Sequence, residues 1–526
     1  MRNLTPSKTL GAIAVAAAVL MTGAASAADT PVQMTLDAGK GGATIDRHIF
    51  GQFAEHLGTG VYGGIWVGKD SPIPNTRGIR NDVVAALKAI KVPDVRWPGG
   101  CYADQYHWRD GVGPKRNARV NTSWGGVIDS NEFGTDEFMD FADQVGTEAY
   151  ISLNVGSGTV QEAADWMEYM TADQPTALQK ERSANGHPAP YKVAIMGIGN
   201  ESWDCGGLMT PAEYAGELKR FGRFVSNYNA SAPTLKVAVG PGTDDTAYTE
   251  AVMKTWKERR GWSFDFQGMS LHSYTVYDGW PPHMPATGFD EQAYANVLSE
   301  TLKMEPLIRK QSAVMDQYDP EKKVALVVDE WGAWLAPTPG SHEGFLQQQN
   351  SQRDAVLAAL NINIFARHAD RVRLANIAQM VNVLQAMILT NGPKMVLTPT
   401  YHVFHMYVPF QDATFIPVTY DAGTYAMGKA TLPRVDAIAA RDKAGKVWIA
   451  ITNIDAKQPA TFSIALAGVK ASKASGQTLT APRLDSVNSF DAPETVTPKA
   501  MSAKVSGGRL SVTVAPASVT VLGLEP

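Results

Sequence analysis

Cysteine is the scarcest residue in this 526-residue sequence, with Cys101 and Cys205 as its only two members. So few cysteines exclude a disulfide-rich scaffold, and no C-x-x-C or His-x-His pair offers a zinc site. We therefore expect chemistry that uses neither a metal nor another cofactor. The two cysteines could form a disulfide in an oxidising compartment or remain as free buried thiols, and the sequence leaves both possibilities open.

Runs of positive charge are also missing. The chain has 47 Lys and Arg against 52 Asp and Glu, a formal net charge of −5, and no basic stripe, so nucleic acid is not expected as a partner. Beyond the N-terminus no window offers the roughly 20 apolar residues that a membrane span needs, so no membrane partner is expected either. The expected ligand is neutral, and the 12 Trp and 17 Tyr are suited to holding a sugar.

The first 27 residues have the composition of a secretory signal. Arg2 and Lys8 are followed by an apolar stretch from Leu10 to Leu20 and by an A-x-A site at residues 25–27. This pattern predicts a signal peptide that is cleaved after Ala27, and hence a secreted protein that is either periplasmic or extracellular.

From residue 44 to 412, short apolar runs alternate with longer amphipathic windows, which is the pattern of βα units around a parallel sheet. Eight apolar runs with helices between them predict an α/β fold, a (β/α)₈ TIM barrel whose active site lies at the C-terminal ends of the strands. The runs are Ile49–Ala54, Val92–Trp97, Ala149–Val155, Val193–Ile198, Leu235–Val239, Phe266–Leu271, Val324–Val328 and Arg373–Ala378.

After residue 412 the texture changes to short alternating segments such as Val447–Asn453, Ala460–Leu466 and Leu510–Val514. These predict a C-terminal antiparallel β-sandwich over residues 413–526. We expect residues 28–43 to contribute one more strand, Val32–Leu36, to that sandwich.

Two glutamates carry the chemical signal, because each follows an apolar run and stands near an aromatic residue. Glu201 lies in the segment Gly199–Trp203, and Glu330 lies in the segment Val328–Gly332. Hydrolysis of a glycosidic bond needs such a pair, since one carboxyl must protonate the leaving oxygen while the other meets the positive charge that develops on the sugar. The sequence therefore indicates a glycosidase.

Several motifs in order along the chain resemble glycoside hydrolase family 51, the α-L-arabinofuranosidases. Each motif alone is weak, whereas their order and spacing together are specific. The matching segments are Ile49–Gly58, Val61–Ile65, Val95–Cys101, Tyr106–Pro114, Gly197–Glu201 and Asp329–Trp331.

The resemblance implies a role for each site residue. It implies that Glu201 is the general acid/base, that Glu330 is the nucleophile, and that Arg96 orients Glu330 and lowers its pKa. Further substrate-binding positions are implied at Glu55, Cys101, Asn200, Tyr274 and Gln379. Cys101 is a departure from family members that carry Asn there, and a thiol is a poor hydrogen-bonding partner for a sugar.

The function implied is that of a retaining exo-hydrolase that removes terminal α-L-arabinofuranosyl residues from arabinan, arabinoxylan and arabino-oligosaccharides. A homo-oligomer is possible, because relatives frequently form one. An endo-acting β-glucanase or β-xylanase on the same barrel is one alternative, and a non-catalytic carbohydrate-binding protein is another.

Overall fold

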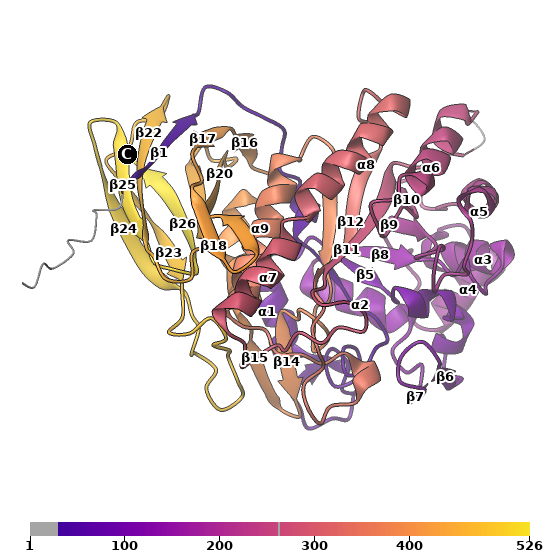
Figure 1. Ribbon diagram of the computed structural model, residues 1–526. Helices are drawn as coiled ribbons and strands as arrows, with labels where there is room; N and C mark the ends of the chain where they lie inside the picture. Colours follow the sequence, from indigo (N-terminus) through magenta and orange to yellow (C-terminus); the bar gives the residue numbers. More distant parts are fainter. Residues whose placement is uncertain (1–29, 261–263) are drawn as a thin grey trace, which may run out of the picture.

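The computed structural model describes residues 30–260 and 264–526 and confirms the predicted fold class. Eight parallel strands form a closed barrel, with helices packed around its outside (Figure 1). The barrel strands are β2 (Gly51–Phe53), β5 (Asp94–Trp97), β8 (Glu148–Ser152), β9 (Val193–Ile198), β10 (Leu235–Ala238), β11 (Gly268–Thr275), β12 (Ala325–Ala333) and β13 (Val372–Ile377).

The helices begin where the sequence supplies their caps. At α5, Thr210 and Glu213 form a reciprocal capping box and Pro211 occupies the first turn. Thr398 accepts a hydrogen bond from the Tyr401 amide at the start of α10, again with a proline in the first turn. The helices are α1 (Asn81–Ala89), α2 (Thr135–Val145), α3 (Val160–Thr171), α4 (Ala177–Ala184), α5 (Pro211–Phe224), α6 (Ala247–Glu258), α7 (Glu291–Thr301), α8 (Met304–Tyr318), α9 (Gln352–Arg367) and α10 (Pro399–Tyr407).

Two barrel strands are longer than their apolar runs. β11 and β12 continue pairing through Thr275 and Ala333, and their register shifts between Ser270 and His272. Glu330 therefore lies inside β12. The sequence predicts instead that it follows the strand. The strand end was misplaced because its last residues are polar and face the barrel mouth, where an apolar pattern carries no information.

The second layer is a β-sandwich built from a ten-stranded sheet that folds over a separate apolar core. Among the described strands of this sheet, all neighbours are antiparallel except β1 and β22. In order, the strands are β16 (Thr414–Ile416), β20 (Val435–Arg441), β21 (Val447–Asn453), β26 (Ser518–Glu525), β23 (Lys473–Leu479), β24 (Lys499–Ser506), β25 (Arg509–Val514), β22 (Ala460–Ala467), β1 (Val32–Asp37) and β17 (Val418–Tyr420).

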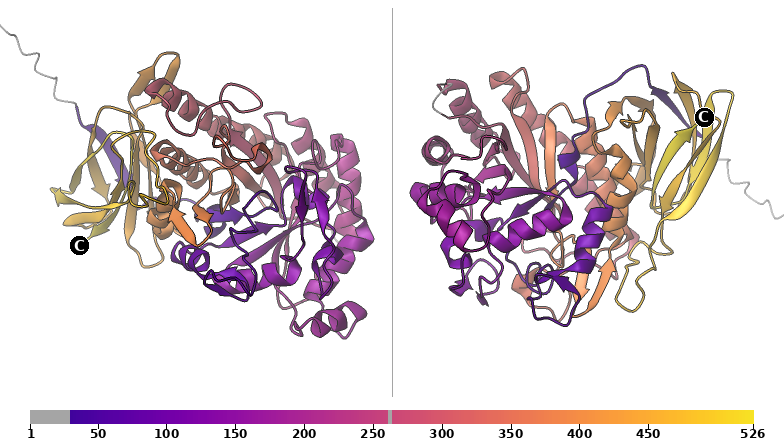
Figure 2. Two further views of the ribbon diagram at one scale, coloured as in Figure 1. Left: turned by 90° about the horizontal axis from the view of Figure 1, so that it is seen from below. Right: turned by 180° about the vertical axis from the view of Figure 1, so that it is seen from behind.

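Strand β1 brings the beginning of the chain into the sheet made by its end. It pairs in parallel with β22 and antiparallel with β17, and Figures 1 and 2 show its indigo ribbon beside the yellow strands. The domain boundaries at residues 43/44 and 412/413 stay predictions.

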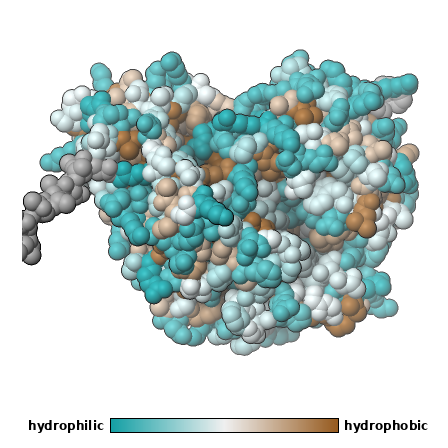
Figure 3. Space-filling model, in the orientation of Figure 1, coloured by the Kyte–Doolittle hydropathy of each residue, from teal (hydrophilic) through white to brown (hydrophobic). Residues whose placement is uncertain are grey.

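Helix α9 of the barrel packs against the sandwich through both hydrogen bonds and hydrophobic contacts. Arg367 on α9 donates to Asp436 on β20 at 2.8 Å, and Asn363 donates to the same carboxylate at 2.8 Å. Around these groups one hydrophobic cluster runs from the barrel into the sandwich strands. On the face shown in Figure 3, exposed hydrophobic residues are scattered among hydrophilic ones.

No described helix is long and apolar enough to cross a membrane.

The loops of the chain contain several short strands and 3₁₀ helices. The small strands are β3 (Asn75–Thr76), β4 (Ile79–Arg80), β6 (Arg119–Asn121), β7 (Val127–Asp129), β14 (Ile388–Asn391), β15 (Lys394–Leu397), β18 (Thr424–Met427) and β19 (Ala430–Pro433), and the 3₁₀ helices are η1 (Arg47–Phe50), η2 (Cys101–Asp104), η3 (Trp108–Gly111), η4 (Glu343–Phe345) and η5 (Val408–Phe410).

Candidate active site

Glu330 is held from both sides at the mouth of the barrel. Its Oε1 accepts a hydrogen bond from Arg96 Nη1 at 2.7 Å, and its Oε2 accepts one from the Tyr274 hydroxyl at 2.7 Å. Arg96 comes from β5, Tyr274 from β11 and Glu330 from β12. Three strands therefore fix the orientation of one carboxylate.

Glu201 stands on a sharp turn just past β9. Its own φ is +34° and that of Gly199 is +95°, both in the left-handed region that side chains disfavour. A Cβ on Gly199 would also lie 3.3 Å from Val155. Backbone strain of this kind is concentrated at functional sites, and here it aims the Glu201 carboxyl across the barrel mouth.

His272 connects the two glutamates. Its Nδ1 lies 2.8 Å from Glu201 Oε1 and 3.6 Å from Glu330 Oε1, and its Nε2 lies 3.2 Å from Asp329 Oδ1. One carboxylate oxygen from each glutamate and a nitrogen of His272 all lie within 4.8 Å of one another. The two carboxyl groups are thus close neighbours in the same mouth.

Burial and the charges of the site shift the pKa values of Glu201, His272 and Asp329 in different directions. Burial raises the pKa of Glu201 and the nearby Glu330 raises it further, against the opposing effect of His272. Burial would lower the pKa of His272, but Glu330, Asp329 and Glu201 raise it to about 10. Burial is likewise opposed at Asp329, whose pKa is lowered by Arg96 and His272. The site thus combines one carboxyl that favours its protonated form with fixed positive charge.

Glu55 and Gln379 form the opposite wall. Glu55 Oε1 accepts from the backbone amides of Gly100 and Tyr102 at 3.1 and 3.0 Å, and its Oε2 accepts from Gln379 Nε2 at 3.1 Å. Burial, with the charge of Glu330, raises the pKa of Glu55 to about 7. Gly100 is required here because a Cβ would lie only 2.6 Å from Glu330 Oε1.

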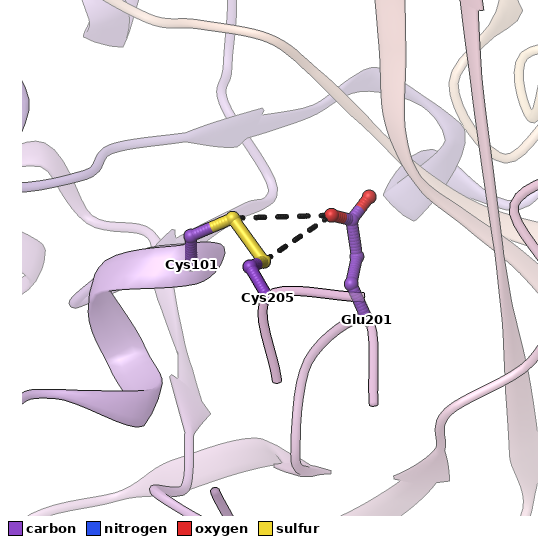
Figure 4. Close-up of side chains that lie close together, drawn as sticks. All are labelled: Cys101, Glu201 and Cys205. Carbon is purple, nitrogen blue, oxygen red and sulfur yellow. Dashed lines mark hydrogen bonds between the residues drawn. A yellow bond between two sulfur atoms is a disulfide. The ribbon is translucent and has the colours of Figure 1, made fainter. Parts of the chain in front are cut away.

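Cys101 and Cys205 form a disulfide, with a Cα–Cα distance of 5.4 Å. Figure 4 shows the disulfide facing the Glu201 carboxyl, whose Oε2 lies 3.4 Å from Cys205 Sγ and 3.9 Å from Cys101 Sγ. Neither sulfur carries a hydrogen in the disulfide, so any hydrogen bond across this contact must be donated by protonated Glu201. Cys101 accordingly has no thiol to offer a ligand.

The structure gathers most of the predicted residues around one pocket. Its lining includes both glutamates together with Glu55, Cys101, Tyr274 and Gln379. Asn200 and Arg96 lie behind this wall, where Arg96 Nη2 donates to Asn200 Oδ1 at 2.6 Å, and among the described residues they do not belong to the lining. Trp124 and Trp334, which the sequence does not single out, border the pocket mouth.

A metal ion would find its best donors at Glu201, His272 and Glu330. Both oxygens of Glu330 already accept strong hydrogen bonds from Arg96 and Tyr274, and a guanidinium is an unfavourable neighbour for a cation. The donor set fits an acid/base pair better than a metal centre. The metal-free prediction stays a prediction.

His272 and Asp329 are two further site residues that sequence reasoning missed. His272 lies two residues before Tyr274, and Asp329 directly precedes Glu330. Tyr150 donates to Asp329 at 2.6 Å, so this acid is buried beneath the pocket. A polar residue within an otherwise apolar strand is the signal that would have found both.

Comparisons with known proteins find relatives over most of the chain. The family model described as the alpha-L-arabinofuranosidase 1 domain matches residues 86–278, and that of the alpha-L-arabinofuranosidase C-terminal domain matches residues 329–518. A Bacteroides ovatus protein named intracellular exo-alpha-L-arabinofuranosidase is 43% identical, over 97% of this chain and 99% of its own length.

Solved structures show the same likeness in three dimensions. The GH51 arabinofuranosidase of Xanthomonas axonopodis pv. citri is 53% identical and has a TM-score of 0.92, covering 94% of this chain and 100% of that one. An alpha-L-arabinofuranosidase from Thermotoga maritima, solved as an arabinose complex, is 30% identical with a TM-score of 0.82 and the same coverage.

The prediction of a secreted protein is wrong, because the Bacteroides ovatus relative is named intracellular. That prediction depended on the composition of residues 1–27, which lie outside the described residues. A charged start followed by small apolar residues is a compositional signal alone.

Proposed function

Because this chain belongs to the α-L-arabinofuranosidases of glycoside hydrolase family 51, we propose that it releases terminal α-L-arabinofuranosyl residues by a retaining, two-step mechanism. Its substrates are arabinan, arabinoxylan and their oligosaccharides. Glu330 is the nucleophile and Glu201 the general acid/base.

The observation that carries the retaining mechanism is the short distance between the two glutamates. Retaining enzymes hold their carboxyl groups about 5–5.5 Å apart, whereas inverting enzymes leave about 6.5–9.5 Å for a water molecule. One carboxylate oxygen of Glu201 and one of Glu330 lie within 4.8 Å of each other, which favours the closer, retaining arrangement. Direct displacement by water is therefore disfavoured.

In the first step a Glu330 oxygen attacks the anomeric carbon while Glu201 gives its proton to the departing oxygen. The raised pKa of Glu201 favours the protonated form that this step needs. Arg96 and Tyr274 hold the Glu330 carboxylate in position. In the second step Glu201, now ionised, takes a proton from water, and the water oxygen displaces Glu330 from the sugar.

The remaining pocket residues bind the sugar in this proposal. Glu55 and Gln379 present polar groups to the hydroxyls, and Tyr274 presents its ring and hydroxyl beside Glu330. Asn200 acts from behind the wall through Arg96. Cys101 contributes the disulfide surface and no thiol hydrogen bond.

An exo mode of action follows from the size of the pocket. Its volume is about 40 Å³, against about 520 Å³ for the groove beside it, so it leaves no room for a continuous chain to pass the reaction centre. The endo-β-glucanase or β-xylanase alternative requires an open cleft that passes through the reaction centre, and this pocket is not such a cleft.

Proton NMR during early hydrolysis tests the mechanism. We expect the α-anomer of arabinose to appear first, and added methanol to give methyl α-L-arabinofuranoside, because an alcohol can intercept the glycosyl-enzyme. Initial β-arabinose without the methanol product would disprove the nucleophilic role of Glu330.

A further inference from the structure

The hydroxyl of Tyr214 lies between the ends of two barrel strands, just before the turn that carries Glu201. Pairing of β9 with β10 extends as far as Ile198 and Ala238. The Tyr214 hydroxyl then donates to the Ile198 carbonyl at 2.7 Å and accepts from the Val239 amide at 2.6 Å. A side chain of α5 therefore forms a hydroxyl bridge between the two strands at the point where their own pairing ends.

A hydroxyl suits this position because its single oxygen both donates and accepts a hydrogen bond. The Tyr214 side chain is fully buried, and its ring stacks on that of Tyr248 with 5.7 Å between the centroids. Without the hydroxyl, a buried N–H and a buried C=O would each lose this partner, which costs free energy. The strand ends would then have to move or to leave both groups unpaired.

The turn that follows β9 depends on where these strand ends lie. Gly199 has a φ of +95° and Glu201 one of +34°, so the chain leaves the strand in a conformation that side chains disfavour. A Cβ on Gly199 would lie 3.4 Å from the Val239 side chain and 3.3 Å from Val155. Strained backbone persists only where its surroundings fix it, and the hydroxyl bridge fixes the residue from which this turn begins.

Further contacts hold the residues that follow Glu201. The Tyr248 hydroxyl donates to the Ser202 hydroxyl at 3.0 Å, and Trp203 Nε1 donates to the Gly240 carbonyl at 3.0 Å. The turn is thus held at both ends, and the hydroxyl bridge lies at the end where the chain leaves β9.

We propose that Tyr214 is a positioning residue for proton transfer by Glu201. Tyr214 does not line the pocket, so it acts through the backbone that carries the acid. The proposal rests on the proposed function, since it presupposes the acid role of Glu201. Proton transfer requires the carboxyl within hydrogen-bonding reach of the leaving oxygen, and a misplacement of about 1 Å can cost about 100-fold in rate.

The test compares two substrates in Tyr214→Phe. Arabinobiose needs a proton on its leaving oxygen, whereas the aryl group of 2,4-dinitrophenyl α-L-arabinofuranoside departs without one. We expect kcat/KM for arabinobiose to fall by roughly tenfold, a partial misplacement of the acid, and kcat/KM for the aryl substrate to stay near the wild-type value. A general loosening of the fold would lower both values alike.

Tyr294→Phe is the matched control. Tyr294 is also a fully buried helical residue that donates to a backbone carbonyl, that of Ile454, at 2.9 Å. This contact joins α7 to the segment after β21 and lies outside the pocket, so the control should keep the wild-type ratio of the two kcat/KM values. Thermal melts verify folding, and hydrogen exchange at the Val239 amide should be faster in Tyr214→Phe than in the wild type.

Placing 4-aminophenylalanine at position 214 tests the hydroxyl bridge by partial restoration. The amine keeps a donor for the Ile198 carbonyl but is a poorer acceptor for the Val239 amide, so the ratio should lie between those of the wild type and Tyr214→Phe. If Tyr214→Phe does not fold, this variant decides by comparison with the wild type. A lowered ratio then supports the proposal, and an unchanged ratio refutes it.

Three outcomes would overturn the proposal. The first is a wild-type ratio in folded Tyr214→Phe, the second is an equal loss on both substrates, and the third is the same loss of ratio in Tyr294→Phe. Glu201→Ala on the same two substrates separates this proposal from the proposed function. Equal losses in Glu201→Ala would refute the acid role itself, whereas a selective loss there without one in Tyr214→Phe would remove the positioning role alone.

Discussion

Opposing effects set the pKa of Glu201. Burial and the charge of Glu330 raise this pKa, whereas His272 lowers it. His272→Gln removes the positive charge 2.8 Å from the carboxyl. Activity needs protonated Glu201 and falls as pH rises through its pKa. Because that pKa should rise without the charge, the basic limb of the kcat/KM profile should move upward by about one pH unit.

The control for this experiment is His107→Gln, which removes a half-exposed histidine 2.9 Å from Glu162, outside the pocket. The pH profile of this control should match the wild type. A basic limb that stays in place in folded His272→Gln would show that His272 does not tune the acid.

The role of Glu201 as proton donor predicts a dependence on the leaving group. An activated aryl group departs without protonation, so Glu201→Ala should lose little in the glycosylation rate with that substrate and at least 100-fold with a sugar leaving group. Pre-steady-state rates on both substrates measure this. Equal losses on the two substrates would contradict the acid role.

The role of Glu330 predicts a larger and less selective loss. Glu330→Ala removes the covalent nucleophile, and activity on every substrate should fall on the order of 10⁴-fold or more. Azide can enter the space left by the side chain and should restore part of the turnover as a glycosyl azide of inverted configuration. Wild-type activity in the folded variant would refute the assignment.

At the scale of elements, the disulfide joins the segments that follow β5 and β9 across 104 residues. Closing so long a loop restricts the unfolded chain, so Cys101→Ala/Cys205→Ala should lower the free energy of unfolding by about 2–4 kcal/mol. Urea denaturation measures the loss, and the wild type treated with a reductant should show the same shift. An unchanged midpoint in both would mean that the disulfide contributes no stability.

The positions of elements were predictable where burial governs the sequence. Each of the eight barrel strands overlaps one of the predicted apolar runs, because a parallel sheet is covered on both faces, and β21 matches its predicted bounds at Val447–Asn453. The polar ends of β11 and β12 were missed, as was His272 between them. Pairing of Cys101 with Cys205 depends on a distance across the barrel mouth, which no local pattern encodes.

At the scale of the whole molecule, Arg367 and Asp436 connect barrel and sandwich. Arg367→Met would leave the Asp436 carboxylate buried without its cation and should lower the free energy of unfolding by about 3 kcal/mol, the lower end for a buried pair because Arg367 is partly exposed. Because the hydrophobic cluster is continuous between the two layers, calorimetry should show one transition that shifts as a unit.

Arg309→Met provides a matched control for this prediction. Arg309 pairs with Glu305, a carboxylate that also contacts Arg367, but its side chain is 69% exposed. Such a surface pair contributes about 1 kcal/mol or less. Two separate transitions, or equal losses in both variants, would show that the Arg367–Asp436 contact does not couple the layers.

The placement of β1 between β17 and β22 has a consequence for the order of events on the ribosome. Residues 32–37 emerge early, yet their partners at residues 418–420 and 460–467 emerge only after nearly the whole chain has been made. At translation rates of about 5–20 residues per second, that delay is on the order of 20 to 80 seconds. During this interval a strand whose Met34 and Leu36 side chains are buried in the finished sheet waits unpaired while the barrel is synthesised, which leaves both side chains open to a chaperone that shields nascent chains.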